Sequence, residues 1–394
     1  MIPSYYEFYN PVKIVSGHKA LDNLPYELEQ LGARRSLIVT GPVIAEAGLI
    51  KHVKRAFAES GMSIGAIYDQ VPNDSSKKVV NEVAQIYRRN DCDALVAVGG
   101  GSVIDTAKGA NIVVTENSDD LVRFVGTGIL RKPMKPLIAI PTTSGSGSEV
   151  TQAAVIADPE RNVKMLFTSY RLLPRVAILD PRMMLTLPPD TTAATGIDAL
   201  AQAIEAYTCL QKNPLSDAYA WTAVKLVSQN LVGVVKNGQD QEGRLVLANA
   251  ACMAGIAFSN SMVGMAHTLG HACGGVCHIE HGVAINIFLP HALEYNMHKI
   301  EDYVAELLLP LAGPEIYALT RRESRAEKSV EFIRDLRDEL HELTQLPRTL
   351  KEAGVARERL TEIAKTALGD ASIIFNPEEL DYKDALRVLN EAYE

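Results

Sequence analysis

The first half of the chain alternates short, almost uninterrupted apolar runs with segments of helical periodicity, and this alternation constrains the fold most. The runs are rich in β-branched residues and cover residues 37–40, 94–98, 137–140 and 176–179, while residues 79–90 show helical spacing. Continuous apolar runs are typical of parallel strands that are covered on both faces. We therefore predict a doubly wound α/β domain that binds its ligand at the carboxyl ends of the strands.

The pattern changes near Asp180, and after Pro188 long helical patterns rich in Ala, Leu and Glu continue to the C-terminus. A chain of 394 residues also exceeds what one hydrophobic core usually supports. We predict an α/β dinucleotide-binding domain over residues 1–182 and a helical metal-binding and substrate domain over residues 183–394. Residues 245–278 contain no Asp, Glu, Lys or Arg, but Asn, Ser and His interrupt them, which favours buried helices over a membrane span.

Composition narrows the class of protein. The net charge of -9 argues against a nucleic-acid or anionic-membrane partner and favours small-molecule chemistry. Five scattered cysteines form no disulfide framework, and the N-terminus lacks the pattern of a secretory signal. We expect a cytoplasmic protein without a membrane anchor.

Two polar loops follow predicted strands. Gly99-Gly100-Gly101-Ser102 stands between an apolar run and a helical pattern, where glycines allow close approach to a phosphate at a helix N-terminus. The fingerprint Gly-x-Gly-x-x-Gly is absent, so this loop alone also fits a tight turn. A second loop over residues 141–149, rich in Ser, Thr and Gly, follows the next run. Two such loops at neighbouring strand ends suit the phosphates and ribose of a dinucleotide.

Candidate metal ligands lie in the second half. Asp198 and Gln202 are one helical turn apart, as are His267 and His271, and His281 follows. A single buried histidine is more often a hydrogen-bonded core residue. Several histidines in an uncharged segment, together with a carboxylate, instead indicate a divalent catalytic metal with a coordination position left for substrate.

The chain resembles the iron-dependent, group III alcohol dehydrogenases over essentially its whole length. The resemblance rests on Gly-Gly-Gly-Ser-x-x-Asp-x-x-Lys at Gly99, Ile-Pro-Thr-Thr-Ser-Gly-Ser-Gly-Ser-Glu at Ile140, Gly-Ile-Asp-Ala-Leu at Gly196 and His-Gly-Val-Ala at His281. It implies a Rossmann-like N-terminal domain, an all-α C-terminal domain, an active site in the cleft between them and a homodimer. It further implies NAD or NADP, a divalent metal (Fe²⁺, or alternatively Zn²⁺), and reversible hydride transfer between a small primary alcohol or diol and its aldehyde.

The resemblance also assigns residues. Asp198, His267 and His281 correspond to metal ligands, Gln202 occupies the fourth ligand position, and His271 corresponds to a catalytic histidine near the nicotinamide that relays a proton. The positions that correspond to the cofactor site are Gly41, Asn73, Gly99, Gly100, Gly101, Ser102, Asp105, Thr142, Thr143, Ser146, Val155 and Lys164.

Two positions depart from the family pattern. The family has a histidine where this chain has Gln202, a poorer ligand, so we predict weaker metal binding. Many NAD-dependent members have an aspartate where this chain has Gly41. Without that carboxylate a 2′-phosphate is not repelled, so we predict that NADPH is tolerated.

Three alternatives remain open from the sequence. The first is another enzyme of the same broad fold, a glycerol-dehydrogenase-like polyol oxidoreductase or a dehydroquinate-synthase-like lyase. The second is a hydroxyacid–oxoacid transhydrogenase, which would turn over without added cofactor. The third is a non-catalytic nucleotide-binding protein, which the retention of Asp198, His267, His271 and His281 disfavours.

Overall fold

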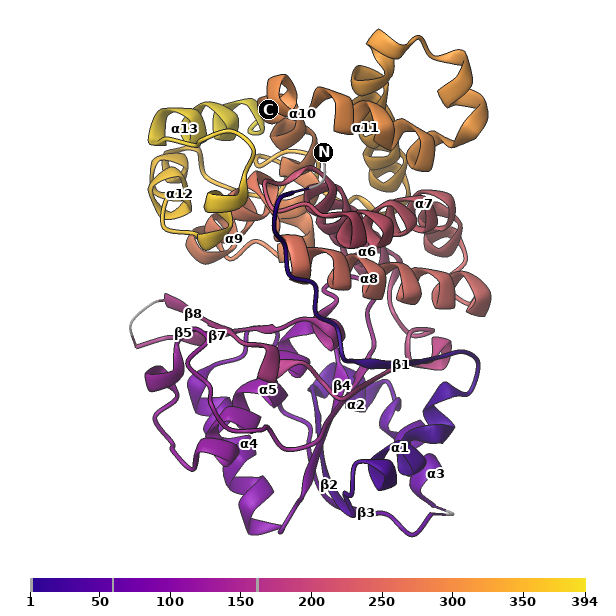
Figure 1. Ribbon diagram of the computed structural model, residues 1–394, viewed down its shortest axis with the longest axis vertical. Helices are drawn as coiled ribbons and strands as arrows, with labels where there is room; N and C mark the ends of the chain where they lie inside the picture. Colours follow the sequence, from indigo (N-terminus) through magenta and orange to yellow (C-terminus); the bar gives the residue numbers. More distant parts are fainter. Residues whose placement is uncertain (1–2, 59, 161–162) are drawn as a thin grey trace. The chain divides into compact units, whose positions relative to one another are not determined.

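The computed structural model describes residues 3–58, 60–160 and 163–394 (Figure 1). Residue contacts group the chain into two units, one of Tyr9–Leu187 and one that joins the residues up to Phe8 with Pro188–Glu394. The sequence predicts a division near residue 182, and the contacts divide the chain between Leu187 and Pro188.

The first unit is built on a six-stranded parallel sheet with the strand order β1-β9-β6-β4-β2-β3. The strands are β1 (Lys13–Ser16), β2 (Arg35–Thr40), β3 (Ser63–Tyr68), β4 (Ala94–Gly99), β6 (Leu137–Pro141) and β9 (Val176–Leu179). The four predicted strands are confirmed as β2, β4, β6 and β9. Strands β1 and β3 were not predicted, because these edge strands are only partly buried and carry no continuous apolar run.

Helices cover both faces of this sheet (Figure 1). They are α1 (Leu24–Gln30), α2 (Pro42–Glu46), α3 (Ile50–Phe57), α4 (Lys77–Arg89) and α5 (Gly101–Glu116). Apolar residues of α1 and α3 cluster with Ile38 and Val96, whereas those of α4 and α5 cluster with Leu37 and Leu95. Because successive strand residues face opposite sides, burial on both sides explains the uninterrupted apolar runs. The helix predicted at residues 79–90 is confirmed as α4.

A second, three-stranded sheet has the order β5-β8-β7 and consists of β5 (Gly126–Thr127), β7 (Ala153–Asp158) and β8 (Val163–Thr168). Strands β7 and β8 are antiparallel, and β7 packs beside α5. Only one face of β7 is fully buried, with Ala154 and Ile156 in the core and Val155 exposed. Burial alternates along β8 as well, so neither strand forms the continuous apolar run by which a strand was predicted.

The described part of the second unit is helical and contains no strand, as the sequence predicts. Its helices are α6 (Pro189–Thr208), α7 (Pro214–Lys236), α8 (Gln241–Ser261), α9 (Met265–Cys277), α10 (His281–Leu319), α11 (Arg325–Thr344), α12 (Leu360–Ala367) and α13 (Tyr382–Glu391). Together the two units confirm the predicted fold class, a parallel α/β domain followed by an all-helical one.

Helix α6 lies in the middle of the helical unit, where it packs against α7, α8 and α10. Small residues permit this close packing: a Cβ at Gly196 would lie 2.3 Å from a methyl carbon of Leu231. Nearly every residue of α6 is therefore buried, including its polar residues Asp198, Gln202 and Glu205. Buried polar groups need partners, so this helix is where a functional site is to be sought.

No single helix of the described residues is long and apolar enough to cross a membrane. Helices α8 and α9 meet that test only as a pair, by length and composition, and they are bent by 101° relative to each other.

Candidate functional site

Three polar side chains lie on one face of α6. Asp198, Gln202 and Glu205 stand at positions i, i+4 and i+7, a spacing that places them one above the other along the helix. Each is at most 6% exposed, so a carboxylate, an amide and a second carboxylate are withdrawn from water together. Burying such a row of polar groups destabilises the folded state unless each group is paired or binds a ligand.

Two histidines from other helices reach Asp198. The distance from Asp198 Oδ1 to Nε2 of His267, in α9, is 3.5 Å, and that to Nε2 of His281, the first residue of α10, is 3.4 Å. A Cβ at Gly282 would lie 2.6 Å from the carbonyl oxygen of Ala194, so glycine lets the first turn of α10 approach α6 this closely. The three ligand atoms lie within 4.8 Å of one another, an arrangement that suits a metal ion.

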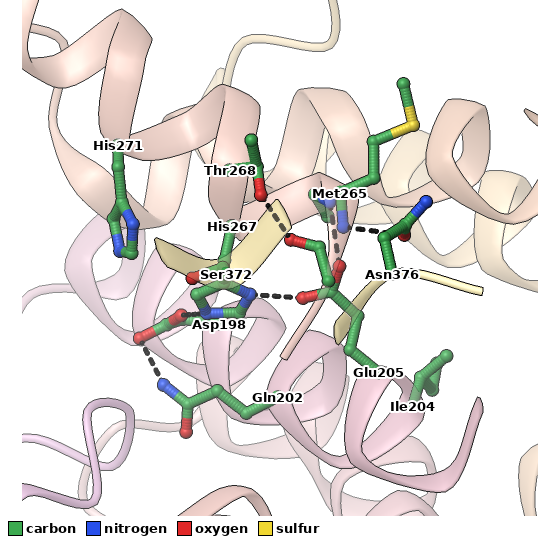
Figure 2. Close-up of polar contacts among 12 residues, drawn as sticks. Asp198, Gln202, Ile204, Glu205, Met265, His267, Thr268, His271, Ser372 and Asn376 are labelled. Atoms are coloured by element: carbon green, nitrogen blue, oxygen red, sulfur yellow. Dashed lines mark hydrogen bonds and ion pairs between the residues drawn. The ribbon is translucent and has the colours of Figure 1, made fainter. Parts of the chain in front are cut away.

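Hydrogen bonding supports a cation at this point. Asp198 Oδ1 and His267 Nε2 are buried and have no hydrogen-bond partner among the described residues. His267 Nδ1 is hydrogen-bonded to Glu205, so the opposite side of its ring faces Asp198 (Figure 2). Buried polar atoms without partners are rare in proteins, and here they point at a common centre. The donor set of one carboxylate and two imidazoles therefore fits a divalent metal.

The electrostatics of this cluster also favour positive charge. Burial by itself would raise the pKa of Asp198, but the two neighbouring histidines outweigh it and hold the pKa below its usual range. Burial would likewise lower the pKa of His267, but Glu205 and Asp198 raise it to about 10. Two carboxylates thus stabilise a positive charge on the ring between them, and a metal cation would replace the proton that carries it.

Gln202 lies beside this cluster but presents its amide nitrogen to it. Nε2 donates a hydrogen bond of 3.0 Å to Asp198 Oδ2, and Oε1 is buried without a partner among the described residues. The amide therefore holds the Asp198 carboxylate through Oδ2 (Figure 2), while Oδ1 lies toward His267 and His281. Its oxygen, the atom that would ligate a metal, is not directed at Asp198.

His271 lies one turn after His267 on α9 and is 40% exposed at its side chain. Its Nδ1 is 2.9 Å from Asp370 Oδ2, and its ring stacks on that of His281 with centroids 5.3 Å apart. Burial would raise the pKa of Asp370, but the contact with His271 and a hydrogen bond from Ser372 lower it. His271 is thus an oriented imidazole at the edge of the cluster.

In the first unit, the two glycine- and hydroxyl-rich loops leave adjacent strands. β4 pairs with β6 in register Gly99↔Pro141, and the Thr142 amide donates to the Gly99 carbonyl oxygen at 3.2 Å. A Cβ at Gly101 would lie 3.1 Å from Ser146 Oγ, so glycine permits the close approach of the second loop. The two loops therefore lie together at the N-terminus of α5, a favourable place for a phosphate.

The second of these loops is packed into the unit. Thr142, Ser144 and Ser148 are buried, which excludes a mobile solvent-facing turn. Helix α5 holds the segment that follows this loop, because the Asp105 carboxylate accepts a hydrogen bond from the Val155 amide at 2.9 Å. The buried ammonium of Lys108 donates to the carbonyl oxygens of Thr151 and Ala153 at 2.8 and 2.7 Å.

The remaining predicted cofactor residues lie around the same edge of the sheet. The Ser102 hydroxyl donates to the carbonyl oxygen of Asn73, in the segment that follows β3. Lys164 forms an ion pair of 2.9 Å with Asp74. Gly41 follows β2, and a Cβ there would lie 2.9 Å from the carbonyl oxygen of Val71. The first unit therefore holds all the predicted cofactor residues, and the second holds all the predicted metal and catalytic ones.

Two acidic partners of the histidines, Glu205 and Asp370, were not predicted from the sequence. Glu205 has a detectable signal, because it lies two turns after Asp198 in an apolar helix and so shares its face. Asp370 has none, since it is 99 residues from His271 and precedes the short helix at Ala371–Phe375. Asn376, which accepts a hydrogen bond from the Met265 amide at 3.0 Å, is equally remote in sequence.

Comparisons with known proteins agree with this arrangement. Residues 11–181 match the model of the iron-containing alcohol dehydrogenase family, and residues 192–393 match that of the C-terminal part of the Fe-containing alcohol dehydrogenases. The chain is 35% identical over 388 residues to the NAD-dependent methanol dehydrogenase of Bacillus methanolicus, covering 98% of this chain and 99% of that protein.

Solved structures give the same result. A crystal structure of 1,3-propanediol oxidoreductase superimposes with a TM-score of 0.94 at 31% identity, covering 99% of this chain and 100% of that one. The sulfoacetaldehyde reductase of Bifidobacterium kashiwanohense, solved in complex with NAD+, superimposes with a TM-score of 0.86 at 26% identity, covering 99% of each chain.

Proposed function

This chain belongs to the iron-containing alcohol dehydrogenase family, and from that premise we propose that it interconverts a small primary alcohol or diol and its aldehyde. The proposed reaction is a reversible, metal-assisted hydride transfer that uses NAD or NADP. The observation that carries the proposal is the convergence of Asp198, His267 and His281, with two buried polar atoms that lack partners among the described residues.

We propose that Asp198, His267 and His281 hold the metal, Fe²⁺ in preference to Zn²⁺. A divalent cation bound there supplies Lewis-acid polarisation of the substrate oxygen. Gln202, at the position where the resemblance places a fourth ligand, orients Asp198 through its amide nitrogen. A three-ligand site leaves room for substrate, so the proposal does not need ligation by Gln202.

His271 is the proposed proton carrier. Its Nδ1 is held by Asp370, so Nε2 lies on the opposite side of the ring and can exchange a proton with the substrate oxygen. Partial exposure of the side chain allows that proton to be exchanged with solvent. Asp370 restricts the rotation of the ring, as expected for a carboxylate that orients an acid or base.

The proposed dinucleotide site is the pair of loops in the α/β unit. Backbone amides at the start of α5 and the hydroxyls of Thr142 and Thr143 would bind phosphate and ribose groups, and the nicotinamide supplies or accepts the hydride. Lys164 is a cation close to this edge of the sheet that could exchange Asp74 for a phosphate. Because Gly41 carries no carboxylate, we propose that NADPH is accepted along with NADH.

The substrate class rests on the relatives, whose names include a methanol dehydrogenase, a 1,3-propanediol oxidoreductase and a sulfoacetaldehyde reductase. Their substrates differ, but each is a small alcohol or aldehyde. We accordingly propose a short primary alcohol or diol. A homodimer in the cytoplasm is the proposed form of the enzyme, and no disulfide links cysteines in the described chain.

The test begins with protein purified anaerobically, stripped with a chelator and reloaded in parallel with Fe²⁺, Zn²⁺ or Mn²⁺. We expect reduction of short aldehydes by NADH or NADPH to be lost on stripping and restored by one metal. Activity that never depends on metal would contradict the metal-assisted reaction. Turnover of a hydroxyacid with an oxoacid without added cofactor would indicate a transhydrogenase instead.

A further inference from the structure

We propose that Glu205 is a positioning residue that sets the metal affinity of the site by holding His267 in a single tautomer. The inference rests on the proposed metal site and assigns a role to a residue that does not itself ligate the metal. It follows from which atoms face the two carboxylate oxygens of Glu205 (Figure 2).

Each of these oxygens accepts from a different donor of α9. Oε1 accepts a hydrogen bond from the Ala266 amide at 2.7 Å, and Oε2 is hydrogen-bonded to His267 Nδ1. An ionised carboxylate only accepts hydrogen bonds, so Nδ1 of His267 must carry a proton. In the neutral ring Nε2 then has its lone pair free, and Nε2 is the atom 3.5 Å from Asp198.

The same carboxylate fixes the position of the ring as well as its protonation. Residues 265 and 266 begin α9, so their amides have no partner within the helix. Glu205 binds the second of these amides, and Asn376 Oδ1 binds the first, that of Met265, at 3.0 Å. Glu205 thus links the backbone and the side chain of consecutive residues to α6.

Asn376 provides a matched control for the capping part of this role. It caps the same turn of α9 and pairs with Asn296 through two amide hydrogen bonds of 2.8 and 3.0 Å. The described hydrogen bonds of its side chain join the Met265 amide, Asn296 and the carbonyl oxygen of Glu378, and none of these partners is a histidine. Loss of Asn376 should therefore weaken the helix cap without changing the tautomer of His267.

A glutamine at position 205 separates the two roles of the carboxylate. Its amide offers one acceptor and one donor where the structure presents two donors. The Ala266 amide can only donate, so it should keep the oxygen, and the new NH₂ group would face His267 Nδ1. That arrangement favours the other tautomer, with the proton on Nε2, which then cannot bind a metal.

Isosteric replacement is preferable to truncation here. A small cavity lined by Glu205, Gly264, Asn296 and Asn376, among others, adjoins the carboxylate and has a volume of about 10 Å³. This is close to the space that one water needs, so Glu205→Ala would enlarge the cavity beside His267 Nδ1 and the Ala266 amide and could admit water as a substitute partner. Glu205→Gln keeps the volume and changes only the hydrogen-bonding pattern.

The experiment measures Zn²⁺ affinity by competition with a chelator for the stripped full-length protein and its variants E205Q, E205D, N376A and E306Q. Glu306 is a second carboxylate of the helical unit, bonded to the Tyr207 hydroxyl, and controls for loss of charge. We expect E205Q to weaken binding about 10- to 100-fold, with E306Q and N376A within about threefold. E205D, which keeps a carboxylate, should recover part of the loss.

The hydrogen bond between His267 and Glu205 is read independently from ¹H–¹⁵N spectra of the wild-type histidines, with His267 assigned from a His267→Asn variant. We expect the Nδ1 proton of His267 in the Zn²⁺ form to be hydrogen-bonded to Glu205, which shifts its resonance downfield and slows its exchange with water. This measurement remains decisive if E205Q does not fold. An Nδ1 proton that exchanges freely with water, or a folded E205Q that binds Zn²⁺ as tightly as wild type, would overturn the role of Glu205. Wild-type protein that binds no metal would instead overturn the proposed metal site.

Discussion

The two units bury charged clusters of opposite character. In the α/β unit, burial dominates: it lowers the pKa of Lys108 to about 8 and raises that of Glu149 to about 7, so both groups tend toward their neutral forms. In the helical unit, pairing dominates: the pKa of Asp198 is lowered and that of His267 is raised to about 10, so both tend to ionise. All four side chains are at most 4% exposed, so depth alone does not explain the difference.

The different pKa shifts of the two clusters arise from the distance to the partners and from their charge. Lys108 donates to neutral backbone carbonyls, and its ion pair with Asp105 is long, with Nζ and Oδ1 4.0 Å apart. His267 lies between two carboxylates, one of them directly hydrogen-bonded. The first cluster stiffens a loop, whereas the second concentrates negative charge where a cation would bind. The contrast implies that charge changes should be severe in the helical unit and mild in the α/β unit.

The largest effect is expected for Asp198→Asn, which removes the charge at the centre of the second cluster. Metal binding should be lost and kcat/KM should fall about 1,000-fold or more, because Lewis-acid stabilisation is worth several kcal/mol. Metal content and turnover are measured on the same samples, with His298→Gln, a change at an exposed ion pair with Glu378, as control. Retention of both metal and activity by Asp198→Asn would show that the charge of Asp198 is not needed to bind a cation, and would contradict the contrast between the two units.

A smaller effect is expected for Asp370→Asn, at the edge of the same cluster. The substitution removes the negative charge that orients His271, so kcat should fall about 10- to 100-fold while metal affinity stays unchanged. Stopped-flow rates and chelator competition separate the two quantities. A parallel loss of metal would place Asp370 among the supports of the metal rather than of the proton carrier.

Gln202→His should have the opposite effect and strengthen metal binding, because it adds an imidazole to the proposed metal site. Since Gln202 presents its nitrogen to Asp198, the proposed metal site has three protein ligands, and a histidine would supply a fourth. We expect metal affinity to rise about tenfold. Affinity that is unchanged by the substitution would contradict the prediction that Gln202 weakens binding.

The fold and the candidate site could be predicted from the sequence only in part. The central strands and the helices that carry Asp198 and His267 were predictable because each forms a continuous local pattern, such as residues 94–98 or the one-turn spacing of His267 and His271. Edge strands and the one-faced β7 lack such a pattern. Asp370 was unpredictable because a pairing over 99 residues leaves no local trace, and the direction of the Gln202 amide is set by packing.

In the α/β unit, two substitutions of Gly41 separate the effect of a side chain close to the Val71 backbone from the effect of a negative charge on cofactor choice. A side chain at this position would meet the Val71 carbonyl oxygen, so Gly41→Ala should lower kcat/KM for NADH and NADPH alike. Gly41→Asp carries the same Cβ and adds a carboxylate, which should reduce the NADPH to NADH ratio by about tenfold relative to Gly41→Ala. Equal ratios in the two variants would show that position 41 does not face the 2′-phosphate.

The smallest effect is expected for Glu149→Gln in the near-neutral cluster. Burial outweighs the attraction of Lys108 and raises the pKa of Glu149 from 4.5 to about 7, so between these values the folded state keeps a proton that the unfolded state releases. The contribution of Glu149 to folding stability therefore falls as pH rises from 4.5 to 7 and is constant above that range.

The glutamine of Glu149→Gln is uncharged at every pH, like the protonated acid. The difference in Tm, variant minus wild type, should thus increase by about 5 °C across this window in metal-free protein and then level off. A difference that stays flat from pH 4.5 to 7 would mean that Glu149 is ionised and paired with Lys108, and the contrast between the two units would then be one of degree, not of kind.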